Sequence, residues 1–178
     1  KLSKEGGKSG RILVYCDIRE VAEKVKKELD TLSARDKKRA EPKADTELFV
    51  GARRVKERED AKAWLENHGF LAGSPPPAKP AFLIATSAGE VGVDLDADHM
   101  VCDLVPWERM VQRLGRVNRR GQGDATIIVV HGDEPKPKKP DAPTDQEIRQ
   151  AIAFRSLSVL NELPNVGTGT DASPGALR

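Results

Sequence analysis

The segment at residues 112–121, QRLGRVNRRG, combines side chains that bind phosphate with two glycines. Five of its side chains can donate hydrogen bonds to phosphate oxygens: Gln112, Arg113, Arg116, Arg119 and Arg120. Each arginine presents a planar fork of N–H groups that can hold two oxygens at once, and the glycines leave room for a close backbone approach. The segment therefore suits a strongly anionic ligand, with a solvated basic helix end as the plain alternative.

The neighbouring residues predict how these donors are held. If a helix begins at Pro106, four apolar residues fall at the i, i+3, i+4, i+7 spacing of one buried stripe: Trp107, Met110, Val111 and Leu114. Gln112, Arg116 and Arg119 have an i, i+4, i+7 spacing on the opposite side. We therefore expect a core-anchored helix that directs these three side chains toward one target.

The stretch from 85 to 103, ATSAGEVGVDLDADHMVCD, predicts a second binding element. The apolar run 81–85 is typical of a buried strand, and Thr86 and Ser87 follow it directly. Two glycines and an acid come next: Gly89, Gly92 and Asp94. Backbone N–H groups of such a loop can meet phosphate oxygens, and Asp94 could accept a hydrogen bond from a sugar hydroxyl.

The elements that must position these segments alternate between strand-like and helical patterns. We expect strands at 11–16, 46–50, 81–86, 98–104 and 124–131, and helices at 18–32 and 53–68. This rhythm predicts an α/β fold, a parallel sheet with helices on both faces. In the first helix the expected buried stripe is Val21, Val25, Leu29 and Leu32. The charged run at 33–45 could grip a phosphate backbone, but a solvated loop is the simpler interpretation.

The ends of the chain have a different composition from its centre. The expected parts are a flexible leader at 1–10, one main domain at 11–132, a proline-lysine linker at 133–144, a helix at 145–161 and a disordered tail at 162–178. Thr144 and Glu147 have the spacing of a capping box at the start of that helix. The sequence does not decide whether the helix packs on the main domain.

Composition narrows the class of protein. The chain has 178 residues and a formal net charge of +2, which is too little for a domain that binds DNA by charge alone. Cys16 and Cys102 lie in apolar runs, so we expect reduced core thiols and a cytoplasmic location. The sequence has no apolar run of the roughly 20 residues that a membrane span needs. Its three histidines have no metal-ligand spacing, and His68 is expected in the core or at a helix end.

In order and spacing, the 85–103 and 112–121 segments resemble motifs V and VI of superfamily 2 helicases, which lie in the second RecA-like domain. RILVYCDI at 11–18 looks like motif IV, and TELFVGARRVKERED at 46–60 resembles the next strand with its phosphate-contacting turn. Among these helicases, the chain is most similar to the CRISPR-associated helicase-nuclease of type I interference systems. The likeness covers about residues 11–131, and it implies the RecA-like form of the α/β fold.

The resemblance implies a role for each matching residue. Arg116 and Arg119 would be arginine fingers for the γ-phosphate of ATP bound on the first RecA-like domain of the same protein, with Gln112 positioning that site. The nucleotide would also be contacted by Gly92, Asp94 and Arg113. Contacts to the backbone of single-stranded DNA would come from Thr86, Ser87, Gly51 and Arg53. A nuclease domain and an RNA-guided surveillance complex are further partners that the family implies.

Half of the ATP site is missing from this sequence. EGGKSG at 5–10 has the Gly-Lys-Ser core of a phosphate-binding loop, but Leu2 stands where the leading glycine belongs. The sequence also lacks an acidic box for Mg²⁺ and the family's His-Asp nuclease pair. Because the chain begins at Lys1 without Met, we expect a piece of a longer protein whose other domain holds Mg²⁺, and no ATP hydrolysis by the isolated chain. The alternatives are a domain of an RNA or repair helicase and a non-catalytic nucleic-acid-binding module.

Overall fold

The computed structural model describes residues 10–35, 44–51, 55–75, 77–87, 90, 93–119, 121, 123–138 and 141–177. The chain divides into two compact units, and the first comprises Lys1–Cys102 with Arg116–Ile128. The second comprises Asp103–Gly115 with Val129–Arg178. This division differs from the predicted main domain at 11–132. Apart from Gly10, the predicted leader lies outside the described residues, as do residues 36–43 of the charged run.

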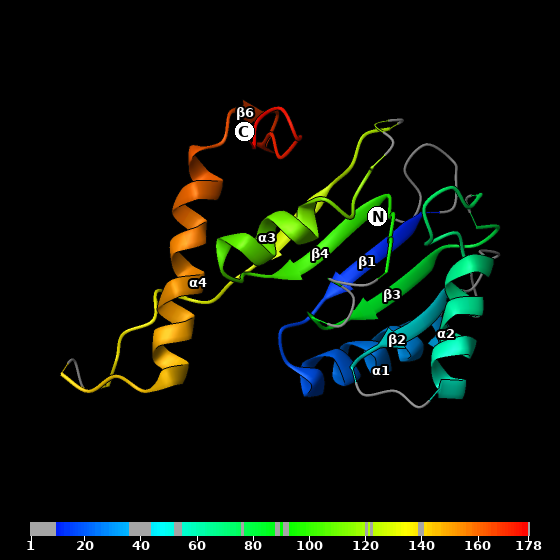
Figure 1. Cartoon of the computed structure of the whole chain (residues 1–178), viewed down its shortest axis with the longest axis horizontal. Coiled ribbons are helices and arrows are strands. Elements are labelled where there is room, and N and C mark those ends of the chain that lie inside the picture. Colours follow the sequence, from blue (N-terminus) through cyan, green and yellow to red (C-terminus); the bar gives the residue numbers. More distant parts are fainter. Residues whose placement is uncertain are drawn as a thin grey trace. The chain divides into compact units, whose positions relative to one another are not determined.

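Five strands form a sheet in the order β2-β3-β1-β4-β5 (Figure 1). Their bounds are Arg11–Tyr15 for β1, Asp45–Phe49 for β2, Ala81–Ala85 for β3, His99–Asp103 for β4 and Ile127–Val130 for β5. The pairs of β1 with β3, β1 with β4, and β2 with β3 are parallel. The predicted α/β class with a parallel sheet is therefore confirmed, and each strand lies within about three residues of its expected bounds.

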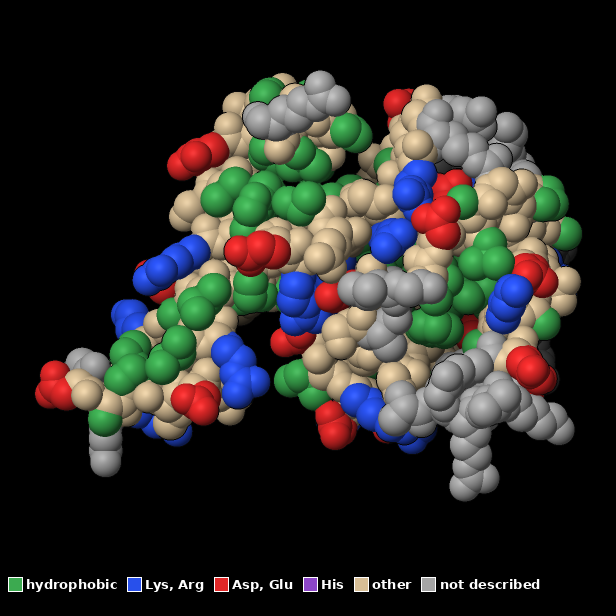
Figure 2. All heavy atoms as spheres, in the orientation of Figure 1, with side chains coloured by type: hydrophobic (Ala, Val, Ile, Leu, Met, Phe, Trp, Pro, Cys, Tyr) green, Lys and Arg blue, Asp and Glu red, His purple; other side chains and the backbone are tan. Residues whose placement is uncertain are grey.

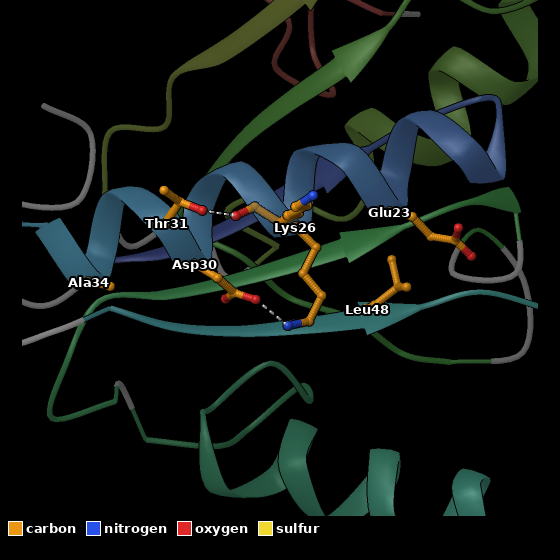
Figure 3. Close-up of a pocket in the computed structure, with 7 residues that line it drawn as sticks. Glu23, Lys26, Asp30, Thr31, Ala34 and Leu48 are labelled. Carbon is orange, nitrogen blue, oxygen red and sulfur yellow. Dashed lines mark hydrogen bonds and ion pairs between the residues drawn. The ribbon is translucent and has the colours of Figure 1, made fainter.

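Helix α1, Arg19–Arg35, packs on the buried strand residues of the first unit. Its contacts with the core come from Ala22, Val25 and Leu29. The expected stripe was wrong at two positions, because Val21 and Leu32 are exposed. Alanine at position 22 allows the helix to approach the sheet closely, so the buried face is rotated toward it. Figure 3 shows α1 above β2, with the second helix, α2 at Val55–Asn67, below that strand.

The end of α2 carries an aromatic cluster. The His68 ring stacks on Trp64 with a centroid distance of 3.9 Å, and Trp64 also stacks on buried Phe70. His68 Nδ1 lies 2.8 Å from the Trp64 carbonyl oxygen, and its Nε2 lies 3.3 Å from Asp45 Oδ2. This arrangement confirms the predicted helix-end role of His68. Gly69 follows with φ of +71°, a left-handed conformation that glycine adopts without strain.

The second unit contains two helices that contact each other, α3 at Trp107–Leu114 and α4 at Asp145–Glu162. The predicted capping box at the start of α4 is confirmed. Thr144 Oγ1 accepts from the Glu147 backbone N–H, and the Glu147 carboxylate accepts from the Thr144 backbone N–H. Ile148, Ile152 and Val159 leave an exposed apolar stripe on α4, and Figure 2 shows green side chains along this helix.

The prediction of a disordered tail was wrong for residues 165–170. Strands β6 at Asn165–Val166 and β7 at Gly169–Thr170 form an antiparallel hairpin. Gly167 in its turn has φ of +59°, which explains how so short a loop closes. Both cysteines are free and buried, as predicted. Within the described part of the chain, no helix is long and apolar enough to cross a membrane.

Candidate functional site

The helix that we expected to carry all three polar side chains ends earlier than predicted. Helix α3 stops at Leu114, and the N–H of Gly115 caps it by donating to the Val111 carbonyl at 3.0 Å. Arg116 and Arg119 therefore lie beyond the helix, in the first compact unit, whereas Gln112 lies on α3 in the second. The single-helix-face prediction was wrong, because the chain after Gly115 pairs with another segment instead of continuing the helix.

That other segment is the short stretch just before β4. The Ala97 N–H donates to the Arg116 carbonyl at 2.9 Å, and the Asn118 N–H donates to the Ala97 carbonyl at 2.8 Å. Together they make a parallel bridge between Ala97 and Val117. Asn118 then takes φ of +47°, a left-handed conformation that asparagine tolerates better than most residues. This turn places Arg119 beside the same segment as Arg116.

The side chains of Arg116 and Arg119 converge on one carboxylate. Arg116 Nη1 lies 3.4 Å from Asp94 Oδ1, and Arg119 Nη1 forms an ion pair with the same oxygen. Arg116 Nη2 also donates to the Glu90 carbonyl at 2.8 Å. The two guanidinium groups are therefore neither splayed apart nor buried in the core, since the Arg116 and Arg119 side chains are 19% and 37% exposed.

The local charge of this cluster suits an anionic group. Two guanidinium charges share a single carboxylate, and the Asp94 side chain is 63% exposed. Ion pairs with such exposure are weak, about 0–1 kcal/mol, so a multiply charged phosphate can compete for the arginines. Arg116 Nε is also buried with no hydrogen-bond partner among the described residues. These residues fit the phosphate portion of a nucleotide.

The two α3 residues of the predicted site differ from each other. Gln112 is exposed, whereas Arg113 is fully buried and donates from Nη1 to the Asp103 carbonyl at 2.9 Å. The buried stripe of α3 is Met110, Arg113 and Leu114, and the predicted stripe was wrong for Val111, which is 40% exposed. In this structure the Arg113 guanidinium packs within the second unit, and its contact with the nucleotide stays a prediction.

The predicted nucleic-acid contacts that the structure describes lie at the ends of two neighbouring strands. Thr86 follows β3, and its N–H donates to the carbonyl of Phe49, the last residue of β2, at 3.2 Å. Gly51 and Ser87 lie just beyond these positions, and both are exposed. Four residues that the sequence analysis named for the predicted site lie outside the described part of the chain: Arg53, Gly89, Gly92 and Arg120.

An ion-pair cluster at the start of β1 was not predicted from the sequence. Arg11, at the start of β1, donates to both carboxylate oxygens of Asp98 at 2.6 and 3.1 Å and to the Gly69 carbonyl at 2.6 Å. Asp96, which is buried, lies 3.8 Å from Arg11. Burial opposes ionisation of Asp98, but the hydrogen bonds and charge of Arg11 outweigh it and lower the pKa of this carboxyl. The sequence signal for this cluster was Arg11, a charged residue at the start of an otherwise apolar strand.

Comparison with known proteins identifies the family. The family described as "CRISPR-associated nuclease/helicase Cas3, C-terminal" matches residues 8–122. The chain belongs to this family. The Cas3 relationship makes the chain the second RecA-like domain of a superfamily 2 helicase, as the resemblance of motifs V and VI implied.

Individual Cas3 proteins and other DNA helicases show the same similarity. A putative CRISPR-associated nuclease/helicase Cas3 of Myxococcus xanthus is 48% identical over 42 residues, which are 24% of this chain and 6% of that protein. The ATP-dependent DNA helicase mph1 of Aspergillus fumigatus is 32% identical over 130 residues, 70% of this chain and 11% of that protein. The chain thus spans a small fraction of the length of its relatives.

A solved Cas3 structure shares the fold of this domain. The crystal structure of T. fusca Cas3-AMPPNP matches with a TM-score of 0.69 and 20% identity, covering 98% of this chain and 19% of that chain. The match extends over nearly all of the present sequence. The RecA-like fold that the sequence predicted is therefore confirmed.

Two other features bear on what this Cas3 domain could bind. A shallow hollow of about 700 Å³ lies between α1 and β2, but its basic side chains are mixed with acids, and Lys26 pairs with Asp30 at 2.8 Å (Figure 3). None of the residues that line it belongs to the arginine cluster. Among the described residues, no group of three or more His, Cys, Asp or Glu side chains is placed to hold a metal ion.

Proposed function

We propose that this domain is the second half of an ATP-dependent DNA helicase motor and supplies Arg116 and Arg119 as arginine fingers. The ATP is held on the first RecA-like domain of the same protein, together with Mg²⁺. The observation that carries the proposal is the convergence of both guanidinium groups on Asp94 Oδ1. Two guanidinium charges that share one exposed carboxylate keep a net positive charge, which favours a more highly charged anion such as a triphosphate.

The chemistry of the site follows from the properties of guanidinium groups. ATP, when bound, supplies a γ-phosphoryl group whose transfer to water develops negative charge on its oxygens. Arg116 and Arg119 neutralise that charge, and fingers of this kind contribute about 10³–10⁵ to turnover in related phosphoryl transferases. Because the Ala97 bridge already fixes the backbone of this segment, little backbone reorganisation is needed when the two arginines act. Gln112, exposed on α3, is proposed to position the same site.

Asp94 has a second proposed role at the nucleotide. Its Oδ1 contacts both arginines, and its Oδ2 has no partner among the described residues. A carboxylate oxygen in this situation can accept a hydrogen bond from a ribose hydroxyl. Gly92, which lies outside the described residues, keeps its proposed position beside the same nucleotide.

The proposed substrate is single-stranded DNA, contacted through its backbone. Gly51, Thr86 and Ser87 lie at the adjoining ends of β2 and β3, and Arg53 follows in the sequence. Contacts of backbone N–H and hydroxyl groups to phosphates position a strand without reading its sequence, as a translocating motor requires. DNA is favoured over RNA because the similar proteins outside the Cas3 family are named ATP-dependent DNA helicases.

The DNA site and the finger site are connected within the first unit. The Glu90 carbonyl accepts from Arg116, and the Glu90 N–H donates to the Ser87 carbonyl at 3.0 Å. Glu90 therefore links Arg116, a proposed ATP contact, to Ser87, a proposed DNA contact. In the cell, the motor is proposed to act in CRISPR interference, with a nuclease domain and an RNA-guided surveillance complex as partners.

Arginine-to-alanine substitutions in the full-length helicase test this function. We expect Arg116→Ala and Arg119→Ala each to lower DNA-stimulated ATP turnover by about 10³-fold or more, with single-stranded DNA binding largely kept. The matched control is Arg19→Ala, which removes an exposed arginine of α1 that pairs with Glu23. Loss of DNA binding with unchanged turnover would instead identify a binding module, and stimulation by RNA but not by DNA would identify an RNA helicase.

A further inference from the structure

Residues 94–97, here called the support, are bonded to residues 116–119, here called the finger segment because they include both proposed arginine fingers. On one side, the Ala72 N–H donates to the Asp94 carbonyl at 3.1 Å and the Asp96 N–H donates to the Phe70 carbonyl at 2.8 Å. On the other side, Ala97 makes both hydrogen bonds of the bridge to residues 116–118. The support is thus fixed to the end of α2 through its backbone, and the finger segment is fixed to the support.

Asp96 adds a side-chain bond to this arrangement. Its Oδ1 accepts from the backbone N–H of Arg119 at 3.2 Å, and its Oδ2 lies 3.8 Å from Arg11 Nη1. The Asp96 side chain is 3% exposed. A buried carboxylate is costly unless charges and hydrogen bonds compensate it, so both partners restrict where this carboxylate can lie.

We propose that Asp96 is a positioning residue for ATP hydrolysis, which fixes the backbone of Arg119 through its carboxylate while Arg11 holds that carboxylate in place. This inference rests on the proposed finger role of Arg119. Arg119 directly follows Asn118, whose backbone is in the left-handed conformation. The hydrogen bond from the Arg119 N–H to Asp96 fixes the backbone immediately after that turn. Without the Asp96 bond, the Arg119 backbone can shift, and a misplacement of about 1 Å at a reacting centre can cost about 10²-fold in rate.

The chain offers a matched pair of carboxylates for the test. Asp96 and Asp98 both contact Arg11, but Asp96 also accepts from the backbone N–H of Arg119, whereas the hydrogen bonds of the Asp98 carboxylate with described residues go to Arg11. In the full-length helicase, we expect Asp96→Ala, which removes the acceptor of the Arg119 N–H, to lower kcat for ATP by about 10- to 100-fold with KM within about threefold. We expect Asp98→Ala to keep kcat within about threefold, although it loses a stronger contact to Arg11.

A double substitution separates positioning from general destabilisation. If Asp96 acts through Arg119, Asp96→Ala causes no further loss of kcat in an Arg119→Ala background, whereas independent effects multiply. Multiplied losses in the double variant, or equal losses from Asp96→Ala and Asp98→Ala, overturn the inference. Unchanged turnover in Arg119→Ala alone overturns the proposed function instead, so the two failures are distinguishable.

A second variant covers the case in which Asp96→Ala does not fold. Arg11→Lys keeps the positive charge at the start of β1 but loses the planar fork that reaches both Asp98 oxygens and the Gly69 carbonyl. We expect a smaller fall in kcat, about three- to tenfold, which also disappears in the Arg119→Ala background. A fall that persists in that background contradicts the inference.

Discussion

The Asp94→Ala substitution is expected to abolish the preference of the full-length helicase for ATP over 2′,3′-dideoxy-ATP. In the structure, Asp94 Oδ1 contacts both arginines, while Oδ2 has no partner among the described residues and is assigned to the ribose. A hydrogen bond to a charged group contributes about 1.5–3 kcal/mol. The parent helicase should therefore prefer ATP in kcat/KM by about 10- to 150-fold.

The same substitution also removes the shared counter-ion of the fingers, and the size of that effect can be worked out. At the 3.4 Å separation of Arg116 Nη1 and Asp94 Oδ1, two unit charges attract by about 1 kcal/mol in water and about 5 kcal/mol at an effective dielectric of 20. The Asp94 side chain is 63% exposed, so the lower figure applies. Losing two such pairs changes kcat/KM by up to about 30-fold for both nucleotides alike.

The ratio of the two kcat/KM values isolates the ribose contact, because the finger effect is common to both nucleotides and cancels. Steady-state ATPase assays with saturating single-stranded DNA give this ratio for the parent, for Asp94→Ala and for the control Asp60→Ala, which changes an exposed acid on α2. A preference that survives unchanged in Asp94→Ala would refute the ribose assignment, whatever happens to the absolute rates.

Three further outcomes are expected. The isolated chain should hydrolyse no ATP above the buffer rate in a phosphate-release assay, and turnover that Arg116→Ala abolishes contradicts this. Met110→Ala should lower the free energy of unfolding by about 2–5 kcal/mol in urea titrations, because Met110 is fully buried, whereas the exposed Val111→Ala should change it by about 0.5 kcal/mol or less. The Lys138 and Thr144 backbone N–H groups and the Thr144 hydroxyl lower the pKa of Glu147 to about 2, below its usual 4.5. The capping box is therefore complete above pH 4.5 and lost as pH falls toward 2, so acid titration by circular dichroism should destabilise α4 less in Thr144→Ala than in the parent.

The strands of this fold could be predicted because their signal is local. AFLIA at 81–85 is an unbroken apolar run, and a strand that is covered on both faces requires such a run. ILVY at 12–15 is a second apolar run, and all five residues of β1 are buried. The buried face of α1 was harder to predict than the strands. Val21 and Ala22 are neighbours, and either can begin an apolar stripe that includes Val25 and Leu29. Contact with the sheet decides between them, and periodicity contains no information about that contact.

The sequence contained one local signal for the end of α3, Gly115, but not its consequence for the arginines. The i, i+4, i+7 spacing runs on from Gln112 to Arg119 without a proline, and this spacing favoured a longer helix over an end at Gly115. What ends the helix in the structure is pairing with Ala97, which lies about 20 residues earlier in the chain. Tertiary hydrogen bonds of this kind outweigh the modest preference of single residues for helix. The ion pair between Arg11 and Asp98 spans 87 positions, so no sequence window could contain both partners.

The segments at 85–103 and 112–121, which resemble motifs V and VI, are joined in the structure by hydrogen bonds and ion pairs. Residues 116–119 take their backbone path from Ala97 and Asp96, and their side chains meet at Asp94. The short stretch DLDA at 94–97 therefore contacts the fingers in two ways. Asp94 contacts their side chains, and Asp96 and Ala97 fix their backbone. Because that stretch is also bonded to Phe70 and Ala72, a displacement of the fingers must either break these bonds or move the end of α2 with it. The domain can therefore present its arginines as a rigid pair.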